Sequence, residues 1–138
     1  MSRVAYAFGG VLGGSGIGRI AGHAARGVHR AGLLDRAVAW AADGDPVPRD
    51  RLTTVPLGEH ASLLPYYYKD LAFDLISERA VGTPELLHGW NNMCLRTIRR
   101  VADHGGVTVV ERASTHPAVQ RELVEAEYRR HGVDEEFV

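Results

Sequence analysis

A glycine-rich segment near the start of the chain, FGGVLGGSGIG, is the strongest candidate for contacting a ligand. Glycine lets the backbone approach a ligand closely because it carries no Cβ. Free amides at the start of a following helix, together with the helix dipole, favour a phosphate or another anion. Gly13, Gly14, Ser15 and Gly16 are therefore predicted ligand contacts, although a plain tight turn would use the same glycines.

A nicotinamide dinucleotide is a second ligand that these glycines fit. The stretch GGSGIGR resembles the cofactor loop of short-chain dehydrogenases, and Asp43 would then bind the ribose. Two features oppose this interpretation. The loop is longer than the dinucleotide fingerprint requires, and the chain has no Tyr-x-x-x-Lys pair, since its one lysine is Lys69 and Tyr66 precedes it by three positions.

The segment HGWNN is a second candidate site, and it follows a predicted strand. Trp90 would stack on a sugar or a base, and the amides of Asn91 and Asn92 would hydrogen-bond hydroxyl groups beside His88. A buried tryptophan next to a helix-capping asparagine explains the same residues, and we favour that interpretation. The nearby Cys94 is expected to be a small core residue rather than a nucleophile.

The segment ERASTHP is the third candidate, and it links a strand to a helix that starts at a proline. Arg112, Ser114 and His116 would lie at the edge of the sheet, where a histidine can hydrogen-bond a ligand in either protonation state. The alternative is that Ser114, Thr115 or His116 only caps the helix.

Changes in apolar periodicity, each marked by glycine or proline, predict the elements that position these segments. The predicted strands cover residues 3–8, 36–42, 85–88 and 107–112. The predicted helices run from Ile17 to Gly32, from Ser62 to about Arg79, over 92–104, and from Pro117 to Gly132, and residues 43–61 are mostly loop. This order predicts one Rossmann-like α/β domain over 1–138, an open and mainly parallel sheet with helices on both faces. Such sheets bind ligands beyond the carboxyl ends of their strands.

The predicted second helix raises a separate question about its tyrosines. Its expected inward stripe consists of Leu64, Tyr67, Leu71, Leu75 and Ile76. The three consecutive tyrosines at 66–68 straddle the helix, so they cannot all be buried. One or two of them are expected to line a groove or to touch a membrane interface.

Composition narrows the classes of protein. The 138 residues carry a formal charge of −1 and are 45% apolar, which indicates one globular domain and argues against nucleic acid as a partner. A single cysteine excludes an internal disulfide or a multi-cysteine metal cluster, and the histidines have no metal-ligand spacing. We expect no metal and a cytoplasmic location, with no targeting segment at the start.

Three segments together, GGSGIG, HGWNN and VVERASTHP followed by QRELVEAEYRRHG, resemble the amino-terminal domain of a retaining glycosyltransferase of the GT-B type, family 4. The resemblance covers most of residues 3–132, although 43–85 carry little motif. It implies one half of a GT-B architecture, the half that supplies the acceptor site. A second Rossmann-like domain would bind the nucleotide-sugar, which is a co-substrate, so no cofactor is implied.

The resemblance also implies roles for individual residues. Gly13, Gly14, Ser15 and Gly16 would approach the donor diphosphate and the acceptor, and His116 would touch the transferred sugar. Glu111 and Arg112 match the strand end without an assigned step. The implied partners are a donor-binding domain or subunit and a sugar, lipid or small-molecule acceptor. We expect a truncated or split enzyme that is inactive alone, either cytoplasmic or at the inner face of the cytoplasmic membrane. A nicotinamide-binding domain and a non-catalytic interaction module stay as alternatives.

Overall fold

The computed structural model describes residues 3–55, 63, 65–114 and 116–133. Five parallel strands form one sheet in the order β3-β2-β1-β4-β5. The strands are β1 (Val4–Leu12), β2 (Leu34–Ala42), β3 (Leu52–Thr54), β4 (Leu86–Trp90) and β5 (Val107–Glu111). The helices are α1 (Ile17–Arg30), α2 (Tyr66–Ala80), α3 (Leu95–Asp103) and α4 (Pro117–His131), with a short 3-10 turn, η1 (Arg49–Arg51), before β3.

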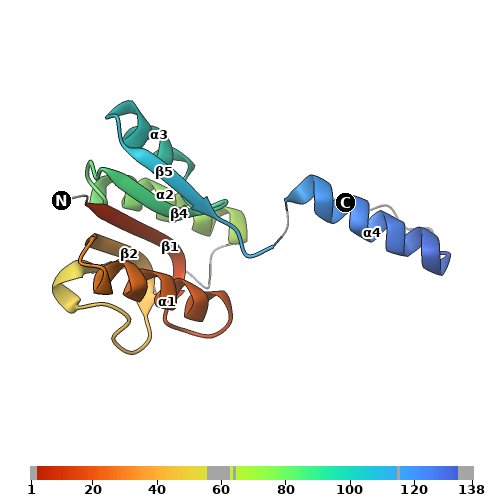
Figure 1. Ribbon diagram of the computed structural model, residues 1–138, viewed down its shortest axis with the longest axis horizontal. Helices are drawn as coiled ribbons and strands as arrows, with labels where there is room; N and C mark the ends of the chain where they lie inside the picture. Colours follow the sequence, from red (N-terminus) through yellow and green to blue (C-terminus); the bar gives the residue numbers. More distant parts are fainter. Residues whose placement is uncertain (1–2, 56–62, 64, 115, 134–138) are drawn as a thin grey trace.

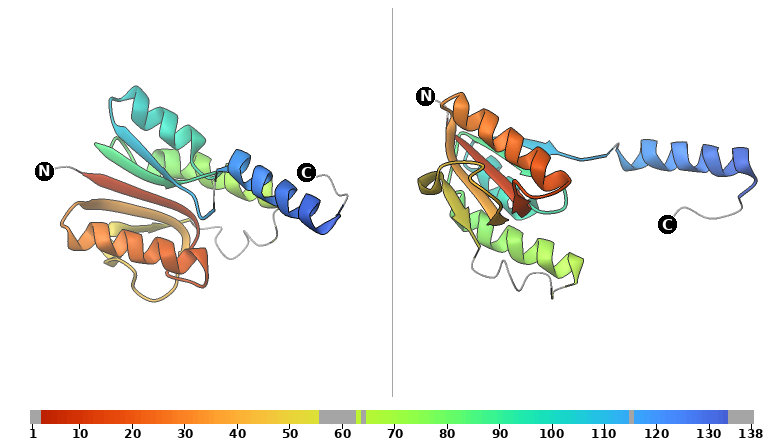
Figure 2. Two further views of the ribbon diagram at one scale, coloured as in Figure 1. Left: turned by 45° about the vertical axis from the view of Figure 1, so that its right-hand side comes forward. Right: turned by 90° about the horizontal axis from the view of Figure 1, so that it is seen from below.

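Helices cover both faces of the sheet, which confirms the predicted Rossmann-like fold (Figures 1 and 2). Side chains alternate along each strand, so β1 supplies both halves of the core. Ala5 and Ala7 pack with Phe73 of α2 and Val101 of α3, while Tyr6 and the next alternate residues pack with α1 on the opposite face. The strand order reverses between β1 and β4, and α1, α2 and α3 all begin at the carboxyl edge of the sheet.

Several predicted boundaries were wrong, each for a local reason. Residues 43–61 were predicted to be mostly loop; the described part contains β3, a three-residue edge strand too short to show a period, and 56–61 lie outside the described residues. β1 continues past Phe8 through two glycines because it pairs with β2 as far as Leu12, beyond an irregularity in register. β2 begins at Leu34 rather than at residue 36, and β4 runs to Trp90.

The third helix begins at Leu95 rather than at Asn92. Asn92 has φ +68°, a left-handed conformation that a right-handed helix cannot contain. No asparagine caps α3 through its side chain; its N-cap is Cys94, and a carboxylate from α2 binds its first amides. The predicted N-cap of the second helix, Ser62, lies outside the described residues.

Most of the inward stripe predicted for α2 was also wrong, although Ile76 does pack against the core and Leu64 lies outside the described residues. Tyr67, Leu71 and Leu75 are 73%, 42% and 45% exposed. The residues that α2 buries are Asp70, Phe73, Asp74 and Ser77. This polar buried side is stable because Ser77 and Asp74 hydrogen-bond to α3, so their polar groups keep partners when they leave water.

α4 projects away from the sheet (Figure 1 and the right-hand view of Figure 2). Its last residue is His131, next to the predicted end at Gly132, and Gly132 has a φ of +65° and forms a left-handed cap. β5, the strand that leads to α4, lies at the edge of the sheet, and its Val107 and Val109 are 60% and 43% exposed. An apolar strip of β5 on the α1 side of the sheet is therefore left uncovered.

Candidate functional site

The glycine loop lies where the sequence places it, between β1 and α1 at the carboxyl edge of the sheet (Figure 1). Gly13 and Gly16 have φ of +86° and +56°, values that favour glycine. A Cβ on Gly13 would lie 2.6 Å from the backbone oxygen of Asp43. The turn after β2 therefore packs directly on the loop, and this contact leaves no room for a side chain at Gly13.

Two further glycines in α1 hold the helix against the loop. A Cβ on Gly18 would overlap the carbonyl oxygen of Val11. A Cβ on Gly22 would lie 2.8 Å from Cα of Gly13. The segment thus needs glycine for close backbone packing as well as for its turns. The sequence pattern alone does not distinguish these two requirements from a need for glycine at a ligand contact.

The start of α1 presents free hydrogen-bond donors. The amide of Gly18 donates to Ser15 and the amide of Arg19 to Gly16, at 3.1 Å each. Within the described part of the chain, the amides of Ser15, Gly16 and Ile17 have no hydrogen-bond partner, no side chain caps the helix, and its first turn holds no acidic residue. These three residues are exposed. Partial positive charge at this end of the helix makes it suitable for an anion.

A second group of polar side chains lies on the same face of the sheet, across β1, β4 and β5. Nε2 of His88 is 2.9 Å from Oε2 of Glu111, and Nε1 of Trp90 donates to the Tyr6 hydroxyl over 2.8 Å. The Glu111 carboxylate lies close enough to act on the Tyr6 hydroxyl, and the Tyr6 ring meets the His88 ring edge-on at 4.8 Å. The strand register explains the grouping, because Tyr6 pairs with His88 and Trp90 pairs with Glu111.

These groups differ in what they can do with a ligand. Burial, and then the nearby Glu111 carboxylate, raise the pKa of Tyr6, so the phenol stays protonated beside that carboxylate. His88 and Glu111 keep 22% and 28% of their side-chain surface exposed. Nδ1 of His88 has no partner among the described residues. The histidine is therefore oriented by Glu111 and is free to hydrogen-bond a ligand through Nδ1.

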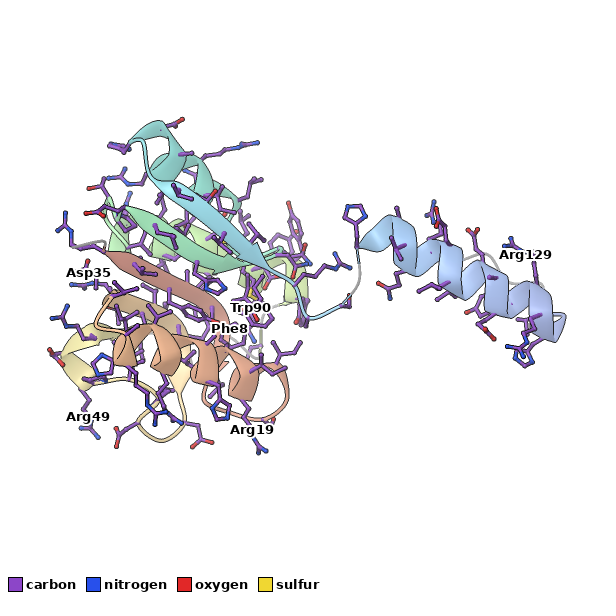
Figure 3. All side chains as sticks on the ribbon, in the orientation of Figure 1. Phe8, Arg19, Asp35, Arg49, Trp90 and Arg129 are labelled. Carbon is purple, nitrogen blue, oxygen red and sulfur yellow. The ribbon has the colours of Figure 1, made fainter. Side chains whose placement is uncertain are left out.

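Aromatic packing connects the two groups. The Phe8 and Trp90 rings lie 5.3 Å apart, and Figure 3 labels them next to each other near α1. The Phe8 ring also lies 3.9 Å from a Cβ built on Gly18. The packed Phe8 and Trp90 rings thus connect the glycine loop with the His88–Glu111 pair. The sequence analysis missed Tyr6, because in the first strand it looks like an ordinary core residue. The pairing of Tyr6 with His88 across β1 and β4 would have identified it, and that strand register is known only from the structure.

The segment after β5 links the end of that strand to α4, as predicted. Nδ1 of His116 accepts from the Ala118 amide over 3.3 Å and caps α4, as the capping interpretation predicted. Nε of Arg112 donates to the Ser114 hydroxyl over 3.2 Å. His116 stands at the base of the projecting helix, and its contact with a transferred sugar stays a prediction.

The HGWNN segment mostly fits the interpretation that its tryptophan is a buried core residue. Trp90 is 2% exposed, so its ring is part of the core. The Asn91 amide donates to the Glu111 carbonyl over 3.0 Å and links the ends of β4 and β5. Cys94 is also buried, as expected, and its thiol donates to the Trp90 carbonyl over 2.8 Å.

We expect Cys94 to be inert towards thiol reagents in the native protein. Burial, with a smaller contribution from the nearby Asp74 carboxylate, raises the pKa of the thiol to about 12, so almost no thiolate forms at neutral pH. Labelling with a disulfide reagent should proceed only on unfolding. Rapid stoichiometric labelling of the folded chain would contradict this packing.

Two general features complete the description of the site. Among the described residues, no three His, Cys, Asp or Glu side chains are grouped so that they could hold a metal ion. None of the described helices has the length and apolar character needed to cross a bilayer.

Comparisons with known proteins do not identify a family. No family model matches the chain, and no curated protein matches it significantly. One solved structure, an uncharacterized protein from Corynebacterium glutamicum ATCC 13032 Kitasato, aligns over 99% of both chains with 17% identity and a TM-score of 0.38.

Proposed function

We propose that this chain is the acceptor-side half of a retaining glycosyltransferase of the GT-B type, family 4. The observation that carries the proposal is the start of α1, where the amides of Ser15, Gly16 and Ile17 are exposed at the carboxyl edge of a parallel sheet and have no partner among the described residues. The sequence resemblance supplies the reaction. A donor-binding domain or subunit would complete the cleft and present the nucleotide-sugar.

The reaction makes simple electrostatic demands. A bond forms between the anomeric carbon and an acceptor hydroxyl oxygen, the bond to the diphosphate breaks, and the hydroxyl proton passes to the leaving group or to solvent. Negative charge grows on the departing diphosphate, and fixed amides at a helix start stabilise it without reorganising. Gly13 and Gly14 keep the backbone close to that charge. No protein nucleophile, metal or cofactor is required.

Different polar residues would contact the acceptor and the transferred sugar. His88, held by Glu111, would hydrogen-bond the acceptor through Nδ1, with Asn91 at the adjoining strand end. His116, with Arg112 and Ser114, lies on the segment that leads to α4 and would reach the sugar when the partner domain closes on that segment. The uncovered strip of β5 is a suitable surface for that partner. A sugar, lipid or small-molecule acceptor and a location in the cytoplasm or at the inner membrane face belong to the same proposal.

The anion site can be tested on the chain alone by titration with pyrophosphate. Ser15→Glu places a negative charge at the exposed start of α1 and should weaken binding at least tenfold, about 1.4 kcal/mol or more. Thr83→Glu is the matched control, because Thr83 is also an exposed hydroxyl residue but precedes β4 at the opposite edge of the sheet. Equal binding by both variants would refute the site.

The reaction itself needs the donor-binding half. Sugar transfer should be measured after mixing the chain with a candidate donor domain, comparing wild type with His116→Ala and Gly14→Val. The Gly14 change should abolish transfer, since its Cβ already meets Val11 at 3.1 Å. Unchanged transfer in both variants would end the residue assignment.

A nicotinamide-binding domain is the second candidate, and the position of Asp43 favours it. Asp43 directly follows β2, and its backbone touches the glycine loop. In dinucleotide-binding folds an acid at this position binds the ribose. NAD should then bind and Asp43→Asn should weaken NAD but not pyrophosphate; absence of NAD binding at millimolar concentration would remove this candidate.

A further inference from the structure

A cavity of about 460 Å³ opens where the first turns of α2 and α3 meet. It is lined by Tyr66, Tyr67, Asp70, Leu71, Asp74, Asn92, Leu95 and Arg96. Both helices start at the carboxyl edge of the sheet, on the face opposite α1. The cavity is therefore separate from the glycine loop, and its argument does not rest on the function proposed above.

Asp70 is the unusual group in this cavity. It is 8% exposed, and no hydrogen bond or ion pair satisfies its carboxylate among the described residues. Burial raises the pKa of Asp70, and the neighbouring Lys69 only partly opposes this effect. The Asp70 side chain is thus largely removed from water and has no protein donor, so a donor or a cation supplied by an occupant would stabilise its carboxylate.

The other charged groups of the cavity already have partners. The Asp74 carboxylate accepts from the Arg96 amide at 2.7 Å, the Thr97 amide at 3.0 Å and the Thr97 hydroxyl at 2.8 Å. Nε of Arg96 is 3.0 Å from Oε2 of Glu78. With that guanidinium paired, the two aspartates leave the cavity with an excess of negative charge.

Aromatic rings complete the lining. Tyr66 and Tyr67 are 74% and 73% exposed at the mouth of the cavity, and Leu71 and Leu95 add apolar surface. Ring faces attract cations, and they do so most strongly beside a carboxylate. Exposed tyrosines that line the same cavity as an acid without a protein partner are suited to a cation carried on an apolar body.

We propose that this cavity binds a small organic cation, an amine or quaternary ammonium group, through Asp70 and the Tyr66 and Tyr67 rings. An anion would be repelled by the two aspartates. A neutral polyol would supply donors to Asp70 but would leave its charge without a counterion. A cation supplies both the missing donor or countercharge and the partner for the rings.

The test is calorimetric titration of the full chain with two matched pairs. Choline is compared with 3,3-dimethylbutan-1-ol, which has the same shape without the charge, and glucosamine is compared with glucose. We expect the charged member of at least one pair to bind with a Kd of about 1 mM or tighter and its neutral partner to bind at least tenfold more weakly. Equal binding within both pairs, or no saturable binding by either cation, would overturn the proposal.

Variants assign the binding to this cavity. Asp70→Asn and Tyr67→Leu should each weaken the cation at least tenfold. Asp103→Asn, an exposed acid at the end of α3 and outside the cavity lining, is the matched control. Cation binding that survives Asp70→Asn and Tyr67→Leu unchanged would place it elsewhere and refute the assignment.

Folding of the key variant provides an independent readout. A folded-state pKa raised above the unfolded value means that stability is lost as pH rises from the unfolded pKa towards the folded one. Asp70 is therefore destabilising at neutral pH, and Asp70→Asn should unfold at a higher temperature than wild type. A loss of stability would show that the carboxylate has a structural partner and would contradict the proposal. Pyrophosphate binding at α1 should be unchanged, which separates failure here from failure of the proposed function.

Discussion

Replacing Gly18 by alanine should destabilise the protein by about 2–3 kcal/mol, although alanine normally stabilises a helix relative to glycine. The added Cβ would overlap the Val11 carbonyl oxygen, which belongs to backbone held by β1 and cannot rotate aside. The helix must move away from the glycine loop. Pyrophosphate binding should be lost together with stability, because the free amides at the start of α1 move with it.

Gly27→Ala is the control within the same helix. A Cβ there meets nothing within 4 Å, so the substitution should stabilise the protein by about 0.5–1 kcal/mol. Urea denaturation of the two variants should thus give changes of opposite sign. If Gly18→Ala also raised the free energy of unfolding, the close packing of α1 on β1 would be wrong.

Asp74→Ala is expected to cost about 3 kcal/mol, because charge-assisted hydrogen bonds lost together leave buried donors unsatisfied. The Asp74 carboxylate receives the Arg96 and Thr97 amides and the Thr97 hydroxyl, so one side chain of α2 caps α3. Thr97 is fully buried, and water cannot replace the lost acceptor without opening the helix interface. The start of α3 should fray in the variant.

Denaturant titrations and amide hydrogen exchange check this expectation. Exchange should accelerate first at the Arg96 and Thr97 amides. Asp74→Asn keeps one acceptor oxygen and should cost less than Asp74→Ala, and the exposed Asp103→Asn should leave stability nearly unchanged. A cost below about 1 kcal/mol for Asp74→Ala would mean that the cap is not needed.

The fold was predictable because its signals are local. Glycine and proline separate short apolar runs from helical periods, and the alternation of the two specifies a parallel α/β sheet. The position of the glycine loop follows from the same pattern. β3 was not predictable, since three residues show no period and Leu52 owes its strand conformation to pairing with Ala37 of β2.

α2 shows where local patterns mislead. Its leucines and Tyr67 form the more apolar-looking stripe, yet the helix buries two aspartates and a serine. The reason lies in α3, whose amides need the Asp74 oxygens and whose Thr97 binds Ser77 over 2.9 Å. Which side of α2 is buried therefore depends on a partner residue twenty positions away in the sequence, and the sequence of α2 alone does not contain that information.

The sequence by itself determined the class of fold, the place of the glycine loop and the burial of Cys94, because each follows from residue type and spacing along one element. Only the tertiary structure decided which polar groups meet. Strand register brings Tyr6, His88 and Glu111 together, and the packing of α2 on α3 leaves Asp70 without a partner among the described residues, beside Tyr66 and Tyr67. Hydrogen-bond satisfaction is a property of pairs, and pairs between distant elements exist only once the chain has folded.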